Sequence, residues 1–266
     1  MPGVVAETGV KVYERRGNER GMDLAETISE RMSYDLDIPV YGAGASREDV
    51  ADIDRRPANS RFKRFVDLAL AIPALIVLAP LLALVALVIW CADGGAPVFV
   101  QQRLGHKGKA FRFYKFRSMR VDAEARLEQL LRDDARAARE WAETRKLRHD
   151  PRITAFGEFI RTWSIDELPQ LINVVRGDMS LVGPRPIVHA SGTELDDTQL
   201  YGSDIAFYKM ARPGLTGLWQ VSGRAETDFS DRVAMDIQYV RQWSAALDIE
   251  IALKTIPAVL LRRGAH

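Results

Sequence analysis

A long uncharged segment restricts how this chain can fold more than any other feature. Residues Leu68 to Ala92 contain no charged side chain, and Pro80 lies near their midpoint. As a helix rising about 1.5 Å per residue, the segment would be about 37 Å long, enough to cross a hydrocarbon core of about 30 Å. The sequence therefore predicts attachment to a membrane. A helix buried in a soluble core is a weaker alternative, because so long an uncharged run is unusual there.

Basic residues flank both ends of this segment. Those before it are Arg55, Arg56, Arg61, Lys63 and Arg64, and those after it are Arg103, Lys107, Lys109, Arg112, Lys115, Arg117 and Arg120. Basic residues beside membrane segments tend to stay cytoplasmic, so a simple crossing would carry one cluster to the far side. A re-entrant hairpin that enters and leaves through one face keeps both clusters, and both ends of the chain, cytoplasmic.

Pro80 provides a position for the break in such a hairpin. Proline lacks a backbone N–H, and its ring clashes with the carbonyl four residues earlier. With the break at Ala79-Pro80, Leu68 to Ala79 forms a half-helix of about 18 Å. The carbonyl groups freed near Ile76 need partners at this depth, and the segment offers no obvious ones. The pattern alone leaves two models open, the re-entrant hairpin and a Pro-kinked spanning helix.

The remaining sequence predicts a helix-rich α+β protein in three parts. We expect a flexible N-terminal extension over residues 1–60, the membrane hairpin over 61–92 and a cytoplasmic domain over 93–266. The only cysteine, Cys91, lies in the apolar segment, so no intrachain disulfide can form.

Within the cytoplasmic domain the pattern predicts three local structures. Strands over 97–101 and 110–116 form a small β-hairpin around a glycine-containing turn. Residues 121–148 form one amphipathic surface helix, and residues 245–261 form another that packs on the core or lies in the membrane interface. The basic cluster after the apolar segment suits anionic headgroups or substrate phosphates, and no nucleic-acid motif accompanies it.

Asp166 and Glu167 form the most suggestive polar pair. Ser164 and Glu167 have the spacing of a capping box, which is a sufficient structural explanation for the pair. The functional interpretation is that a helix N-terminus lowers the pKa of Asp166 and keeps its carboxylate available as a nucleophile. Glu167 and Asp166 would then hold a divalent ion, for which Mg²⁺ suits hard oxygen ligands.

Several arginines and a lysine are candidates for holding phosphate. Proline on both sides fixes the direction of Arg185, whose planar guanidinium suits phosphate oxygens. Arg161, Lys115 and Arg117 are further candidates. Each can also be a solvated surface charge. The histidines show no metal-ligand spacing.

These pieces occur together and in a fixed order. The segments are QQRLG (101–105), KFRSM (115–119), DPRIT (150–154), DELPQ (166–170), GDMSLVGPRP (177–186) and RPGLTG (212–217). Together they closely resemble the bacterial sugar transferase family, the monotopic phosphoglycosyl transferases. The resemblance runs from about Arg61 to Leu261, roughly three-quarters of the chain, and adds Arg212 to the phosphate-binding candidates.

The resemblance implies an enzyme on the cytoplasmic face of the bacterial inner membrane. Such enzymes transfer a hexose-1-phosphate from a UDP-sugar to undecaprenyl phosphate, release UMP and begin exopolysaccharide or other surface-glycan synthesis. It also implies a re-entrant anchor with a helix, a break and a second helix. Our hypothesis for the reaction has Asp166 as the nucleophile, a covalent aspartyl-phosphosugar intermediate and Mg²⁺ as cofactor. The family usually has Ser-Pro at the break, whereas this chain has Ala79-Pro80.

The resemblance favours the re-entrant model and leaves other points open. A UDP-glucose or UDP-galactose donor fits the exopolysaccharide-initiating members, and a UDP-N-acetylhexosamine donor is the alternative. A non-catalytic membrane-surface scaffold for glycan assembly is the competing function. The polymer, a homodimer and the role of residues 1–60 are left open.

Overall fold

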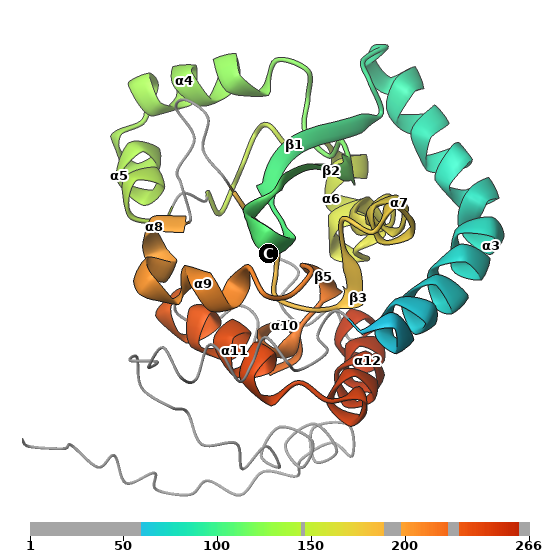
Figure 1. The fold of residues 1–266 in the computed structure, drawn as a ribbon. Coiled ribbons are helices and arrows are strands. Elements are labelled where there is room, and N and C mark those ends of the chain that lie inside the picture. The colour runs from blue at the N-terminus through green and yellow to red at the C-terminus, as the bar shows by residue number, and fades with distance from the viewer. Residues whose placement is uncertain (1–59, 145–146, 189–197, 223–228, 261–266) are drawn as a thin grey trace, which may run out of the picture. The chain divides into compact units, whose positions relative to one another are not determined.

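The computed structural model describes residues 60–144, 147–188, 198–222 and 229–260. The predicted N-terminal extension, apart from its last residue, lies outside these ranges. The described part contains helices from α3 to α12 and strands from β1 to β5 (Figure 1). It confirms a helix-rich α+β fold.

Helix α3 (Arg61–Asp93) contains the whole apolar segment and runs through Pro80 without interruption. It begins where the Ser60 hydroxyl accepts the Lys63 backbone N–H, and it ends at Gly94, which has a φ of 69°. Figure 1 shows α3 as a bowed helix along one side of the described fold. The prediction of a helix interrupted at Ala79-Pro80 is therefore wrong. A proline inside a helix removes one hydrogen bond, and curvature can absorb that loss.

The start of α3 is tied to the rest of the fold by buried polar contacts. Arg64 donates from its guanidinium to the carbonyls of Val174 and Val175, at 2.5 and 2.8 Å. The Asp67 carboxylate, which is 3 % exposed, accepts from the Ser180 hydroxyl at 3.0 Å. Such pairing offsets the cost of burying a charge next to an apolar helix.

The end of α3 is held separately. Arg117 forms an ion pair with Asp93 through both terminal guanidinium nitrogens, with the Nη1 contact at 2.9 Å. Val85 and Ile89 on α3 are buried against Phe116. Both ends of α3 therefore rest on the same body.

The predicted β-hairpin is confirmed. Strand β1 (Val98–Leu104) pairs antiparallel with β2 (Ala110–Phe116), and a single 3-10 turn, η1 (His106–Gly108), joins them. Strand β4 (Ile187–Val188) pairs with the other side of β1, so the order is β2-β1-β4 and β2 is an edge strand. Strand β1 runs further than the five residues predicted.

The single helix predicted over residues 121–148 is wrong, because two helices occupy this region. Helix α4 (Ala123–Asp133) ends before Asp134, and α5 (Ala135–Thr144) follows. Asp134 Oδ1 accepts the backbone N–H groups of Arg136 and Ala137 at 2.7 and 3.2 Å. An aspartate that satisfies these N–H groups starts a new helix.

The later elements build the rest of the body. They are α6 (Ala155–Thr162), η2 (Ile165–Glu167), α7 (Gln170–Arg176), β3 (Ser180–Val182), α8 (Thr198–Tyr201), η3 (Gly202–Asp204), α9 (Ile205–Tyr208), β5 (Gly214–Thr216), α10 (Leu218–Ser222), α11 (Phe229–Gln242) and α12 (Ala245–Leu260). Strands β3 and β5 pair in parallel. The helix predicted near the C-terminus is confirmed as α12.

Buried apolar side chains join α3, β2 and α7 into one core. The cluster consists of Ala71, Phe111, Phe113, Leu171, Val174 and Met179. The alternation of β2 turns Phe111 and Phe113 to this core. This cluster fixes α7 against β2. Strand β2 and the turn η2, which lies just before α7, carry candidate site residues.

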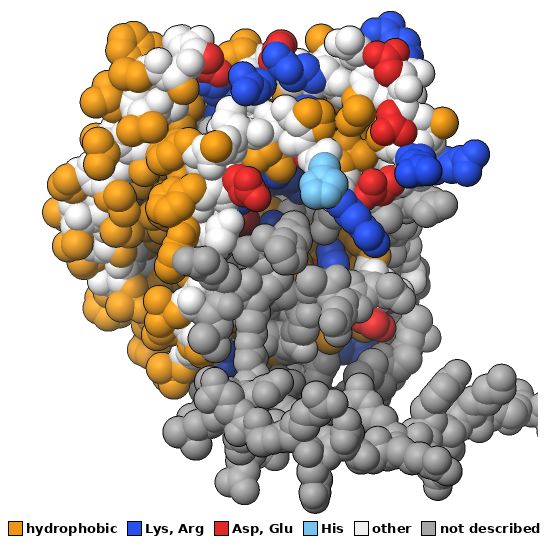
Figure 2. Space-filling view, turned by 180° about the vertical axis from the view of Figure 1, so that it is seen from behind, with side chains coloured by type: hydrophobic (Ala, Val, Ile, Leu, Met, Phe, Trp, Pro, Cys, Tyr) orange, Lys and Arg blue, Asp and Glu red, His pale blue; other side chains and the backbone are white. Residues whose placement is uncertain are grey.

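One side of the molecule is apolar. Among the described residues, α3 is the helix that is long and apolar enough to cross a membrane. Its exposed side chains include Ile76 and Val77, at 68 % and 76 %. Figure 2 shows hydrophobic side chains gathered along the side where α3 lies. On α12 a second stripe is exposed, consisting of Ile249, Leu253, Ile256 and Leu260.

The stability of the fold should depend on the close approach of Gly183 and Gly214, where a single added methyl group has no space. A Cβ at Gly214 would lie 2.1 Å from the Gly183 nitrogen and 2.3 Å from the Thr216 carbonyl oxygen. We expect Gly214→Ala to lower the free energy of unfolding by about 3 kcal/mol or more, because backbone must move. Gly202→Ala is the control, since its Cβ meets nothing within 4 Å and only its φ of 51° costs about 1 kcal/mol. Equal thermal midpoints for both variants would contradict this.

Candidate active site

The segment before α7 places Asp166 and Glu167 in a tight turn. Ser164 adopts left-handed backbone with a φ of 55°, an uncommon conformation for a residue other than glycine. The 3-10 turn η2 follows, and α7 begins only at Gln170. The Ser164 side chain makes no capping hydrogen bond, so the capping-box interpretation is wrong. Local strain next to a polar pair is typical of a functional site.

Asp166 is buried and paired with a lysine from β2. Its residue is 2 % exposed, and Lys115 Nζ lies 2.8 Å from Asp166 Oδ2. Glu167 is more accessible, and its Oε1 lies 3.7 Å from the same ammonium. Arg185 Nη2 lies 3.4 Å from Glu167 Oε1. The structure thus brings together four residues that the sequence singled out.

The electrostatics of Asp166 are set mainly by burial. Burial raises the pKa of its carboxyl above the usual value, Lys115 opposes that rise, and Glu167 adds to it. The prediction of a lowered pKa is therefore wrong in direction, because the expected helix N-terminus is absent and removal from water dominates. A carboxylate that is poorly solvated but still paired has few water molecules to lose before it attacks.

Arg161 completes the positive surroundings of Asp166. Its Nε donates to the Ser118 hydroxyl at 2.7 Å, and its charge favours the ionised form of Asp166. Burial lowers the pKa of Arg161, and Asp166 and Asp150 oppose that shift. Helix α6 can carry Arg161 this close because Gly157 lies against Ser118, where a Cβ would be 1.9 Å from the carbonyl oxygen.

The turn that carries Arg185 is held by Arg103 and Trp219, neither of which was among the predicted site residues. Arg103 Nη1 donates to the Pro186 carbonyl at 3.1 Å, and the Arg185 guanidinium lies 5.5 Å from the ring centroid of Trp219. The sequence did contain an indication for Arg103, because it lies in QQRLG (101–105), the first of the family-like motifs.

Asp236 on α11 also faces this turn. It is fully buried, and the Tyr201 hydroxyl donates to its Oδ2 at 2.8 Å. Burial raises the pKa of Asp236 to about 7, while Tyr201 and the backbone N–H of Arg185 favour its charged form. Nothing in the local sequence distinguishes it from a surface carboxylate of an amphipathic helix.

Two predicted phosphate-binding residues lie elsewhere. Arg117 is engaged with Asp93 at the end of α3. Arg212 Nε donates to the Gly177 carbonyl at 3.0 Å, beyond the last residue of α7, whereas Asp166 precedes the first. Both guanidinium groups hold helix ends, and the structure does not bring them to Asp166.

Asp166 and Glu167 are the candidate metal ligands. The described residues contain no group of three or more His, Cys, Asp or Glu side chains placed to hold a metal ion. Two adjacent carboxylates nevertheless fit Mg²⁺, which usually takes one or two carboxylates and completes its shell with substrate phosphates and water.

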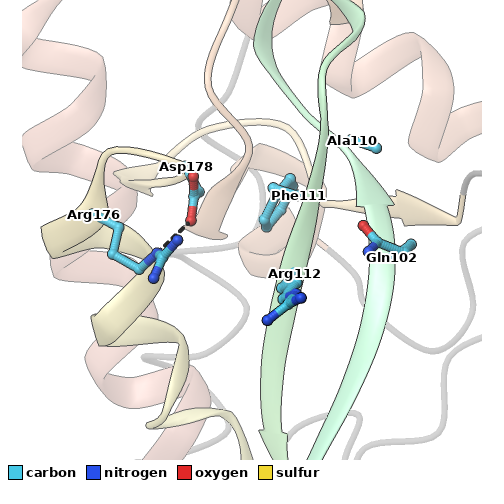
Figure 3. Close-up of a pocket in the computed structure, with 6 residues that line it drawn as sticks. All are labelled: Gln102, Ala110, Phe111, Arg112, Arg176 and Asp178. Atoms are coloured by element: carbon cyan, nitrogen blue, oxygen red, sulfur yellow. Dashed lines mark hydrogen bonds and ion pairs between the residues drawn. The ribbon is translucent and has the colours of Figure 1, made fainter.

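A separate pocket lies at the start of β2 and the end of α7 (Figure 3). Its lining is Gln102, Ala110, Phe111, Arg112, Arg176 and Asp178. Arg176 and Asp178 form an ion pair at 3.2 Å on one wall. None of the predicted site residues lines this pocket.

Comparison with known proteins supports the family that the motifs indicate. A family model described as bacterial sugar transferase matches residues 58–262. The chain belongs to the bacterial sugar transferase family. The matched region includes α3, the hairpin and all the candidate site residues.

Individual relatives are similar over the same region. The exopolysaccharide production protein ExoY of Sinorhizobium fredii is 46% identical over 211 residues, covering 79% of this chain and 91% of ExoY. The undecaprenyl-phosphate galactose phosphotransferase of Salmonella typhimurium is 48% identical over 212 residues, covering 78% of this chain but 42% of the relative. The undecaprenyl-phosphate glucose phosphotransferase of Komagataeibacter xylinus is 42% identical over 223 residues.

Removing the lysine partner should change the pH dependence of this sugar transferase. Lys115 favours the ionised form of Asp166, so Lys115→Met should raise the pKa of Asp166 still further. Fewer molecules then carry an ionised Asp166 at a given pH, and the acidic limb of the rate profile moves to higher pH. We also expect a loss of about 100-fold or more in kcat. Steady-state rates across pH measure both effects.

Lys109→Met is the matched control for this experiment, because Lys109 is exposed on the same hairpin. A Lys115→Met profile that coincides with that of the wild type and of the control would contradict the assignment.

Proposed function

We propose that this sugar transferase moves a hexose-1-phosphate from a UDP-sugar to undecaprenyl phosphate and releases UMP. The observation that carries the proposal is the buried Asp166 carboxylate with Lys115 Nζ at 2.8 Å, beside Glu167 and Arg185. The names of several relatives support the lipid acceptor and the sugar phosphate. The name of ExoY supports a role in exopolysaccharide production.

The reaction has two covalent steps. In the first, an oxygen of the Asp166 carboxylate attacks the phosphorus that bears the sugar, an Asp–O–P bond forms, and the bond to the UMP oxygen breaks. In the second, a phosphate oxygen of undecaprenyl phosphate attacks the same phosphorus, and Asp166 leaves as a carboxylate. Covalent catalysis lets a water-soluble donor and a lipid acceptor react in turn.

The basic residues would hold the charge that the reaction moves. Lys115 keeps Asp166 ionised before attack, and its ammonium then faces the new phosphodiester oxygens. Arg185 lies beside Glu167, and its side chain is 42 % exposed, so its guanidinium can hold phosphate oxygens. Mg²⁺ bound by Glu167 and Asp166 would neutralise the pyrophosphate, which makes UMP a better leaving group.

The donor is UDP-glucose or UDP-galactose in this proposal. Two relatives are named as a galactose phosphotransferase and a glucose phosphotransferase, which supports these donors. The alternative donor is a UDP-N-acetylhexosamine.

The packing of α3 supports a re-entrant anchor rather than a crossing. Its first turn is tied to α7, and its last residue is tied to Arg117 after β2. A polar body that contacts both ends of a helix would have to lie on both sides of the bilayer if that helix crossed it. The exposed apolar side chains of α3 and of α12 would enter the lipid from one face.

The nucleophile can be tested by trapping the intermediate. With donor alone, intact-protein mass spectrometry should show wild-type protein gaining the mass of one hexose phosphate. Asp166→Asn should show no adduct and lower UMP release by about 10⁴-fold or more. Glu167→Gln is the matched control, which should be slower but still form the adduct, because it keeps the nucleophile.

An adduct on Asp166→Asn would disprove the assignment. If purified wild-type protein releases no UMP with any UDP-sugar of a panel, a non-catalytic scaffold explains the chain better.

The topology of α3 can be tested by labelling introduced cysteines. Cys91, the single cysteine of the chain, is exposed on α3 and is first replaced. In a Cys91→Ser background, Arg55→Cys and Glu124→Cys place one thiol on each side of the apolar segment. A membrane-impermeant maleimide added to intact spheroplasts should label neither variant, and after lysis it should label both. Labelling of only one variant in intact spheroplasts would show a crossing.

A further inference from the structure

The free edge of β2 is occupied by one side chain from α7. Asn173 is fully buried, at 0 % exposure. Its Oδ1 accepts the backbone N–H of Tyr114 at 3.2 Å, and its Nδ2 donates to the Arg112 carbonyl at 2.6 Å. The amide therefore takes the place of a neighbouring strand at the edge of the sheet.

These two bonds act close to the catalytic pair. Tyr114 immediately precedes Lys115 on β2. Helix α7 begins at Gln170, and only Leu168 and Pro169 separate it from the turn that holds Asp166. The Lys115–Asp166 ion pair joins β2 to η2, the turn that leads into α7. An apolar core alone holds α7 against β2 but permits sliding, because hydrophobic contacts are not directional. The amide bonds fix the register.

The backbone of Asn173 controls a third segment. Its carbonyl accepts the N–H groups of Gly177, Asp178 and Met179, at 3.1, 3.0 and 3.2 Å. These bonds turn the chain out of α7 towards β3, after which the chain reaches Arg185. One residue of α7 therefore binds both β2, which carries Lys115, and the chain that leaves α7 towards β3.

We propose that Asn173 is a positioning residue, whose amide bonds to the edge of β2 set the distance between the Asp166 carboxylate and the Lys115 ammonium. It touches neither substrate nor phosphate in this role. The inference rests on the proposed function for its kinetic consequence, but the distance itself does not depend on turnover.

The test compares two variants of Asn173 in full-length protein purified in detergent. Asn173→Leu removes both hydrogen bonds to β2 at similar volume, and it also removes the Nδ2 contact to Asp178 Oδ2 at 3.3 Å. Asn173→Asp keeps the acceptor for the Tyr114 N–H and loses the donor to the Arg112 carbonyl, so it replaces Asn173→Leu in the test if that variant does not fold.

In single-turnover UMP release, we expect Asn173→Leu to be slower by about 100-fold, the cost of misplacing a reacting group by about 1 Å. The donor concentration at half-saturation should change little, and the acidic limb of the pH profile should move to higher pH.

Val174→Ala is the matched control. Val174 is the next residue of α7, is equally buried and packs in the apolar core. Its truncation should lower the thermal midpoint and leave the release rate per folded molecule and the pH profile unchanged.

A second readout needs no substrate. Lys115 should react slowly with an amine-directed acylating reagent while it is paired with Asp166, and peptide mass spectrometry should show faster modification in the Asn173 variants only. If both variants keep the wild-type rate, pH profile and Lys115 reactivity, or if Val174→Ala changes them equally, Asn173 acts only in stability and the inference fails. If wild-type protein releases no UMP but Lys115 reactivity changes in the Asn173 variants alone, the positioning role stands and the proposed function fails.

Discussion

A carboxylate can be buried only where cations or hydrogen-bond donors accompany it, and this constraint governs the centre of the structure. Asp166 is almost out of contact with water, and Lys115 supplies its cation from another element. The pair exists only while β2 and the segment before α7 stay in register. The protein therefore needs a rigid junction at this point. The core shared by α3, β2 and α7 and the Asn173 amide bonds to β2 together provide it.

Helix α3 has two roles that are usually divided between different parts of a membrane protein. Its outer side is exposed and apolar, and its inner side contributes Ala71, Val85 and Ile89 to the buried clusters of the body. The membrane segment is thus one wall of the domain that holds the site. In the proposed reaction, this arrangement keeps the nucleophile close to the level of lipid headgroups, where the phosphate of a prenyl lipid lies.

The sequence was sufficient for features that depend on local pattern or on motif order. The β-hairpin, α12 and the grouping of Asp166, Glu167, Lys115 and Arg185 belong to this class. The sequence was insufficient to predict the role of a side chain that can bind more than one kind of partner, because tertiary contacts then decide which partner it binds. A guanidinium suits a phosphate or the carbonyls at a helix end, and only packing assigned Arg212 to the latter. Burial, which no short motif encodes, likewise reversed the expected direction of the pKa shift of Asp166.

The position of β2 at the edge of its sheet has a further consequence. An edge strand presents unpaired N–H and C=O groups, which another chain can use to extend the sheet and begin aggregation. Asn173 occupies one donor and one acceptor in the middle of β2, and α7 covers the strand there. Crowding of many copies on a membrane would make such pairing more frequent. The helix beside the site thus also protects the fold against intermolecular β-pairing.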